Sequence, residues 1–228
     1  MAGSDTRLAA ASAHGSAGFR PDIEGLRAVA IGLVLLYHSG IRWVPGGFVG
    51  VDVFFVISGF LITGLLIREI ERTGRVSLSQ FWARRAKRLL PASALTLVVT
   101  AIATWLIVPA TQWRAFGADI SAAALYVVNW RFAAEAIDYD AEGNGVSPVL
   151  HFWSLAVEEQ FYIVWPLLIV LVALWLRRRP RARTRLVLGA AIAAVIVPSF
   201  VWSVVMTQSQ PTQAFFVTTT RLWELGIG

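Results

Sequence analysis

Long apolar runs, most of them about 16 to 21 residues, recur along this 228-residue chain and constrain its fold more than any other feature. A helix of about 20 apolar residues crosses the ~30 Å hydrocarbon core of a bilayer. A backbone in lipid must satisfy its own hydrogen bonds, so such runs predict helices. We therefore expect an all-α, polytopic transmembrane helix bundle, with spans at 24–43, 47–67, 90–109, 156–176 and 186–206 and another starting near 215.

Basic residues gather in two stretches between these runs, 68–88 and 177–185. Positively charged loops stay on the cytoplasmic side of a membrane, so we expect both stretches there. The net charge of +6 then reflects topology, and we expect membrane lipids rather than nucleic acid as partners. Residues 1–19 are small and polar and lack a signal-peptide pattern. They predict a disordered cytoplasmic tail on a multi-pass protein of the cytoplasmic (inner) membrane.

The two basic stretches also predict the course of residues 115–132. Both stretches can be cytoplasmic only if an even number of crossings separates them, and 90–109 with 156–176 supply two. The segment 115–132 carries ionisable and amide side chains that are expensive in lipid. We expect it to be re-entrant or interfacial, with the acidic loop 133–150 outside. The alternative is an ordinary span that breaks the charge rule.

The chain ends at "RLWELGIG", within what reads as another apolar helix. We therefore expect residues 20–228 to be the N-terminal part of a larger membrane domain. The chain has no cysteine, which excludes disulfides, cysteine metal sites and thiol nucleophiles. We expect no metal.

Two ionisable residues bracket the first apolar run. Arg27 and His38 are eleven positions apart, which on a helix places both on one face, roughly 16 Å apart along the axis. Arg27 is explained equally well as an interfacial arginine that extends toward water. An ionisable residue inside a span marks a reaction or transport path more often, which favours function for His38.

Asp52, in the next run, lies seven residues after Pro45, just as His38 lies seven before it. In a hairpin that turns at Pro45 the two side chains share one depth. A carboxylate on one imidazole nitrogen would leave the other as a general base. The alternative is a buried pair kept for packing specificity. We interpret the small residues nearby as packing residues: Gly46, Gly47, Gly50, Ser58 and Gly59.

The stretch "FWARRAKRLLP" at 81–91 places Arg85 and Arg88 three residues apart before a span. On a helical turn they project the same way and could hold phosphates with their planar guanidinium groups. The alternative is a topology determinant that contacts anionic lipid.

The stretch 147–166, "SPVLHFWSLAVEEQFYIVWP", holds the densest polar group. Ser154 is a candidate N-cap, which would place Glu158 and Glu159 in the opening turns of a helix, where its dipole favours anions. His151 lies near the same edge, and Tyr162 follows Glu158 by four residues on one face.

The aromatic residues of that stretch, Trp153, Phe161, Tyr162 and Trp165, could form an aromatic belt at the membrane surface. Serine, histidine and glutamate together also occur in hydrolase triads. No nucleophile elbow surrounds Ser154, however, so the sequence argues against that chemistry.

Five motifs in order resemble acyltransferase family 3, the membrane O-acyltransferases, over roughly residues 19–228. They are "FRPDIEGLRAVAIGLVLLYH", "GGFVGVDVFFVISGFLI", the Arg-x-x-Arg of Arg85 and Arg88, "HFWSLAVEEQFYIVWP" and "RLWELGIG". The resemblance implies an enzyme of about ten helices that moves an acyl group, commonly acetyl, from cytoplasmic acyl-CoA to a carbohydrate hydroxyl. Acceptors in this family include lipopolysaccharide, peptidoglycan, other polysaccharides and glycosylated small molecules.

The resemblance and the chemistry together assign roles to particular residues. We expect His38, Asp52 and Glu158 to take part in catalysis, with His38 as general base. We expect Arg27, Arg85 and Arg88 to hold acyl-CoA. The remaining candidates are acceptor-binding residues: His151, Trp153, Ser154, Glu159 and Tyr162.

Two other classes of function remain open at the sequence level. A proton-coupled transporter or channel would also use ionisable residues inside the membrane. A non-catalytic scaffold would explain the apolar bulk but not polar residues at matching depth. The sequence does not indicate an oligomeric state.

Overall fold

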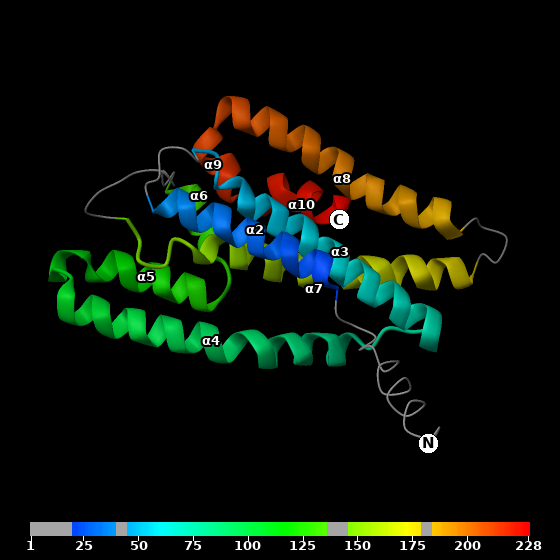
Figure 1. The fold of residues 1–228 in the computed structure, drawn as a ribbon, viewed down its shortest axis with the longest axis horizontal. Helices are drawn as coiled ribbons and strands as arrows, with labels where there is room; N and C mark the ends of the chain where they lie inside the picture. Colours follow the sequence, from blue (N-terminus) through cyan, green and yellow to red (C-terminus); the bar gives the residue numbers. More distant parts are fainter. Residues whose placement is uncertain (1–19, 40–44, 136–145, 179–183) are drawn as a thin grey trace, which may run out of the picture. The chain divides into compact units, whose positions relative to one another are not determined.

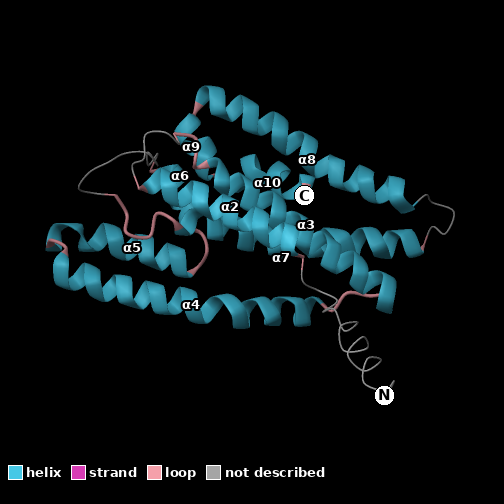
Figure 2. Ribbon diagram, viewed as in Figure 1, coloured by secondary structure: helices cyan, strands magenta, loops and turns pink. Residues whose placement is uncertain are grey.

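The computed structural model describes residues 20–39, 45–135, 146–178 and 184–228. Most of these residues are helical, and they include no β-strand (Figure 2). The elements in chain order are α2 (Pro21–His38), α3 (Val49–Thr73), α4 (Leu78–Ile107), the short 3₁₀ helix η1 (Ala110–Gln112), α5 (Trp113–Ala124), α6 (Val128–Ala134), α7 (Phe152–Arg177), α8 (Thr184–Ser209), α9 (Pro211–Phe216) and α10 (Thr218–Ile227). The all-α prediction is confirmed.

Four of the described helices are long and apolar enough to cross a membrane: α3, α4, α7 and Leu186–Ser209 of α8. The protein is therefore a membrane protein. The predicted first span, 24–43, is not among the four. Its described part, α2, has 18 residues and includes Asp22, Glu24 and Arg27, and 40–44 lie outside the described residues.

The basic stretch 68–88 is not the loop that the sequence predicts. The α3 helix continues to Thr73 and α4 begins at Leu78, so only residues 74–77 connect them. Gly74, at a φ of +71°, makes the reversal, and Ser77 N–H donates to Glu69 Oε1 at 2.9 Å. Hydropathy marks only the part of a helix that lies in lipid, whereas arginine and lysine extend a helix readily beyond it.

The chain divides into two compact units, 1–54 and 55–228. In the first unit the start of α3 packs closely on α2. A Cβ atom at Gly47 would collide with the Leu33 carbonyl oxygen, and one at Gly50 with that of Ala30. The packing role predicted for these two glycines is confirmed, whereas Gly46 has open space around it.

In the second unit α7 contributes much of the core. The predicted aromatic belt is wrong, because Trp153, Phe161, Tyr162 and Trp165 are each at most 3% exposed. The rings of Phe161 and Trp165 stack with centroids 4.7 Å apart, and Trp165 Nε1 donates to Thr63 Oγ1 of α3 at 2.8 Å. These rings pack between helices and not at the surface where a belt would lie.

Residues 115–132 bend as predicted. Chain direction changes at 125–127, where Tyr126 has a φ of 54°, and α5 runs back beside α4 (Figure 1). The α5 helix has 12 residues and α6 has 7, so neither reaches the length of a span. Arg131 Nε donates to the buried Asp119 at 2.6 Å, which raises the pKa of the guanidinium and joins the two short helices.

The described parts of the two basic stretches, 68–88 and 177–178, lie at the same end of the second unit (Figure 1). A Cβ atom at Gly74, just after α3, would lie 3.1 Å from Arg177 Nη2 at the end of α7. Two of the helices able to cross a membrane, α4 and α7, lie between them in the chain, which is an even number. We call this end of the second unit the basic end. Residues 136–145 of the acidic loop 133–150 lie outside the described residues. The location of this loop on the outer side of the membrane stays a prediction.

Candidate active site

In the first unit, α2 carries Arg27 and His38. Arg27 forms an ion pair with Glu24 one turn earlier, with Nη1 3.2 Å from Oε1. His38 Nδ1 lies 2.8 Å from the carbonyl oxygen of Val34 in its own helix. A carbonyl only accepts hydrogen bonds, so this contact assigns the proton to Nδ1 and leaves Nε2 of the neutral ring as an acceptor. This is the tautomer that a general base requires.

Asp52 is half-buried in the first turn of α3, where the helix dipole favours its negative charge. The sequence assigns Asp52 the task of fixing the tautomer of His38. In the structure the Val34 carbonyl already meets Nδ1. The pairing of Asp52 with His38 stays a prediction.

In the second unit, Arg85 of α4 reaches into a polar group on α7. Its guanidinium carbon lies 3.4 Å from the centroid of the Tyr162 ring, a cation–π contact. Its Nη2 lies 3.6 Å from Glu159 Oε1. Next to it, Trp82 Nε1 donates to the Tyr162 carbonyl at 3.0 Å and ties α4 to α7.

Ser58 of α3 completes this group by donating to Glu158 Oε1 at 2.5 Å. Three helices that are far apart in sequence thus meet at two adjacent carboxylates. We call Ser58, Arg85, Glu158, Glu159 and Tyr162 the carboxylate cluster. From the sequence we interpreted Ser58 as a packing residue, but its hydroxyl donates a hydrogen bond to a carboxylate.

Two buried atoms of the carboxylate cluster, Arg85 Nε and Glu159 Oε1, have no hydrogen-bond partner in the described part of the chain. Buried polar atoms without partners are rare in native proteins and call for an explanation such as a ligand. Arg88, by contrast, is exposed. The two arginines predicted to act together therefore have different surroundings.

The start of α7 differs from the prediction. The helix begins at Phe152 with His151 as N-cap residue, so Ser154 lies inside the first turn and does not cap it. Its hydroxyl donates to the His151 carbonyl at 3.4 Å. Turns closed by hydrogen bonds between residues three apart, such as Phe152 N to Val149 O at 2.9 Å, lead directly into the helix, which moves its start earlier. The helix dipole acts most strongly within the first turn. Glu158 and Glu159 lie beyond that turn.

The other acceptor-binding candidates on α7 lie in two settings. Trp153 is buried, with its ring 4.7 Å from that of Phe215. His151 is exposed and lines a cavity of about 250 Å³ with Ser93 and other residues of α4 and α7. Trp153 is not part of the lining of this cavity.

A buried amide network adjoins the carboxylate cluster and was not predicted. Gln160 Nε2 donates to Tyr126 O at 2.8 Å and to Asn129 Oδ1 at 2.9 Å. Gln160 Oε1 accepts from Thr218 Oγ1 at 2.6 Å and from Trp130 Nε1 at 2.9 Å. Asn129, fully buried, donates to Thr218 and to a backbone carbonyl. The only sequence signal was the position of Gln160, directly after the two glutamates.

A second group missed at the sequence level lies on α10. Arg221 Nη1 pairs with the buried Glu224 Oε1 at 2.7 Å, and its guanidinium carbon lies 5.0 Å from the Phe215 ring centroid. The spacing of three residues could have indicated this pair. No group of three or more metal-ligating side chains that could hold a metal ion occurs among the described residues.

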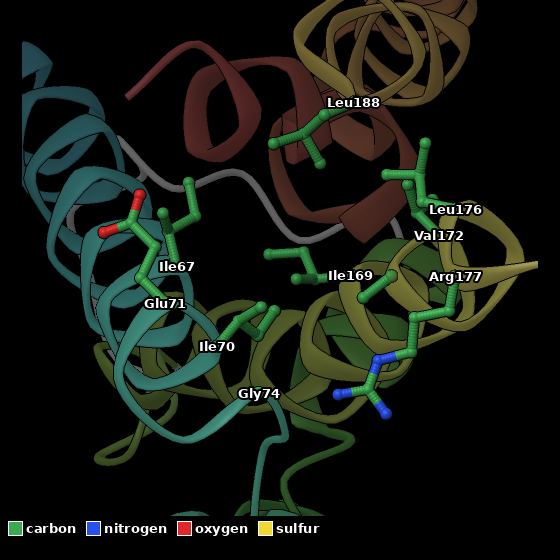
Figure 3. Close-up of a pocket in the computed structure, with 10 residues that line it drawn as sticks. Ile67, Ile70, Glu71, Gly74, Ile169, Val172, Leu176, Arg177 and Leu188 are labelled. Carbon is green, nitrogen blue, oxygen red and sulfur yellow. The ribbon is translucent and has the colours of Figure 1, made fainter. Parts of the chain in front are cut away.

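An apolar cavity of about 650 Å³ opens at the basic end between α3, α7 and α8 (Figure 3). Ile67, Ile70 and Ile169 line it, and Glu71 and Arg177 stand at its edge. We call it the apolar cavity.

Comparison with known proteins now identifies the family. Residues 20–223 match the family described as "Acyltransferase domain", acyltransferase family 3. The chain belongs to this family. The match includes both the α2 residues and the carboxylate cluster, and it confirms the resemblance inferred from the five motifs.

Three bacterial relatives are similar over most of the chain. The Staphylococcus aureus (strain MSSA476) protein SAS0844 is 40% identical over 210 residues, 92% of this chain and 34% of that protein. The O-acetyltransferase OatA of Staphylococcus aureus (strain NCTC 8325) is 37% identical over 211 residues, 92% of this chain and 34% of that protein. The peptidoglycan O-acetyltransferase OatA of Listeria monocytogenes is 36% identical over 207 residues, 90% of this chain and 32% of that protein.

This family member spans about a third of the length of these relatives. No solved structure matches it.

Proposed function

We propose that this family member forms part of a membrane O-acyltransferase. It moves an acyl group, in particular acetyl, from acyl-CoA to a hydroxyl of a cell-surface glycan. The observation that carries the proposal is the family match over residues 20–223, together with relatives named as O-acetyltransferases. The peptidoglycan named for the Listeria relative makes a cell-wall glycan, free or lipid-linked, the first acceptor to test.

The proposed general base is His38. With its proton on Nδ1, Nε2 takes the proton from the acceptor hydroxyl. The hydroxyl oxygen forms the new ester bond as the bond between acyl carbon and CoA sulfur breaks, and the thiolate takes up the proton from His38. General base catalysis of this kind contributes about 10²- to 10⁴-fold. Asp52 is proposed to stabilise the imidazolium that forms in between.

The proposed donor site lies at the basic end, which we assign to the cytoplasm because positively charged segments are retained there. Arg85, with Nε buried and without a partner among the described residues, has a donor to offer a phosphate or thioester oxygen. Arg88 and Arg27 are proposed to add charge to the same ligand. We further propose that α2 crosses together with the undescribed residues after it, which makes the N-terminus cytoplasmic, and that the membrane is the cytoplasmic (inner) one.

The proposed acceptor-binding residues are the polar and aromatic side chains of α7. Glu159 and Tyr162 hold Arg85 in place, and Glu158 is proposed to orient the acceptor or relay its proton. His151, Trp153 and Ser154 are proposed to contact the glycan.

The decisive experiment measures transfer of labelled acetyl from acetyl-CoA to peptidoglycan fragments in membranes that contain the full chain. We expect His38→Ala to lower transfer by about 10²-fold or more. The matched control is Ser39→Ala, which removes only a hydroxyl bonded to the Leu35 carbonyl of the same helix. Normal transfer by a folded His38→Ala protein would refute the proposed role. Proton flux without acceptor or transfer would favour a transporter instead.

A second measurement tests the donor site. The double variant Arg85→Ala/Arg88→Ala should raise the KM for acetyl-CoA about tenfold or more, because each lost charged hydrogen bond weakens binding by that order. The control is Arg114→Ala, an exposed arginine on α5. An unchanged KM in the double variant would exclude these arginines from the donor site.

A further inference from the structure

A third cavity lies on the opposite face of α3 from the apolar cavity, and charge rather than aliphatic side chains surrounds it. It has a volume of about 490 Å³ and lies between the last turns of α3 and the first turns of α4. We call it the arginine cavity. Its lining residues are Leu65, Arg68, Glu69, Arg72, Gln80 and Arg84.

Helix geometry explains why these side chains converge. Arg68 and Arg72 are four residues apart on α3, and Gln80 and Arg84 are four apart on α4, so each pair shares one helix face. The short connection at 74–77 turns the two faces toward one cavity.

The cations of the arginine cavity are not neutralised from within the described chain. Its one carboxylate, Glu69, accepts the Ser77 N–H at 2.9 Å and so closes the helix connection. None of Arg68, Arg72 and Arg84 forms an ion pair with an acidic side chain of the described residues. Like charges four residues apart on a helix destabilise it. An anion in the cavity would remove that repulsion.

Arg84 and its neighbour Arg85 therefore serve different places. Successive helical residues point about 100° apart. Arg85 contacts Tyr162 and Glu159 on α7, whereas Arg84 lines the arginine cavity beside α3. The family motif at Arg85 and Arg88 does not include any of the three arginines of the cavity.

We propose that the arginine cavity binds the phosphate groups at the nucleotide end of the acyl donor. Guanidinium groups pair with phosphate oxygens through two parallel hydrogen bonds, and three of them around one space suit a ligand with several phosphates. The volume lies within the range of small-molecule sites. The cavity lies at the basic end, where the donor is proposed to bind, so this inference rests on the proposed function.

An anionic lipid headgroup offers the same phosphate chemistry from another source. The test therefore uses the full chain in nanodiscs of zwitterionic phosphatidylcholine, with CoA and 3′-dephospho-CoA as probes in isothermal titration. The variants are Arg72→Gln and Arg84→Gln. The control is Arg178→Gln, which removes one exposed charge at the same end outside the cavity.

We expect each variant to bind CoA about tenfold more weakly, because each loses charged hydrogen bonds to phosphate, while the control binds as the wild type does. The loss should be smaller for 3′-dephospho-CoA, which has one phosphate fewer. Unchanged CoA affinity in both variants, with normal wild-type binding, would overturn this inference and leave the proposed function intact.

Two further outcomes also count against the inference. If wild-type protein neither binds CoA nor transfers acetyl, the proposed function fails as well. If the variants keep CoA affinity but retain less anionic lipid from the expression host, the cavity binds headgroups, and its assignment to the nucleotide is wrong.

Discussion

At the scale of single residues, the carboxylate cluster shows what sequence reasoning reaches and where it stops. The spacing of Arg85 and Arg88 indicated the arginine, and the place of Glu158 and Glu159 at the start of a predicted helix indicated the two carboxylates. The partner of Glu158 was not predictable, because Ser58 lies 100 positions away. A helix that is apolar on most faces has no pattern that fixes its rotation, so sequence does not reveal which side chain of α3 meets α7.

The Ser58–Glu158 hydrogen bond yields a stability prediction. Ser58→Ala leaves a partly buried carboxylate without its donor, and hydrogen bonds to charged groups contribute about 1.5–3 kcal/mol. We expect the free energy of unfolding of the detergent-solubilised protein to fall by about that amount.

The comparison for this prediction is Ser209→Ala, whose hydroxyl is exposed and bonds only to its own helix, and which should change the free energy by at most about 0.5 kcal/mol. Equal effects of the two substitutions would show that the 2.5 Å contact contributes nothing.

At the scale of elements, hydropathy predicted the four long apolar helices α3, α4, α7 and α8, but neither the shorter α2 nor the ends of the helices. The predicted span 90–109 corresponds to α4, which begins at Leu78. The predicted N-cap at Ser154 was wrong because hydrogen-bonded turns before it already lead into the helix, which begins at Phe152. Apolar runs report the thickness of the lipid, and polar helical turns beyond it leave no mark in such a pattern.

A substitution at Gly59 tests the close contact between α3 and α10. A Cβ atom there would collide with the backbone carbonyl of Leu225 on α10, so Gly59→Ala must push the two helices apart. We expect a loss of about 1–3 kcal/mol in unfolding free energy, the usual cost of overpacking.

Gly117→Ala provides the matched control, since this helical glycine of α5 has nothing within 4 Å of the added atom. It should be neutral or stabilising by about 1 kcal/mol, because alanine favours a helix. If Gly59→Ala proved as harmless, the α3–α10 contact would not be close in the native protein.

At the scale of the whole molecule, two basic stretches on the same side of the membrane require an even number of crossings between them. This predicted that residues 115–132 do not cross, and the break between α5 and α6 agrees. The amide network that holds this break was out of reach of the sequence. Its members come from α6, α7 and α10, and amide side chains carry no charge signal. Local patterns do not encode contacts between segments so far apart.

The topology can be tested directly, because the chain has no cysteine and every introduced one is unique. With the basic end in the cytoplasm, cysteines at Ser79 and Arg178 should react with a membrane-impermeant maleimide only after cells are permeabilised. Cysteines at Thr111 and Gln210, each at the opposite end of a spanning helix, should react in intact cells. If the cysteines at positions 79 and 178 reacted from opposite sides, the two basic stretches would not lie on the same side of the membrane.

The amide network also determines the order in which contacts form while the chain is synthesised and inserted. Asn129 leaves the ribosome 89 residues before Thr218, the hydroxyl to which it donates. Until α8 has been inserted and α10 follows, the network lacks Thr218, whose hydroxyl bonds both Asn129 and Gln160. Its final docking is therefore a late, post-insertion event, and a nascent chain released before residue 218 would leave two amides to be shielded by the insertion machinery.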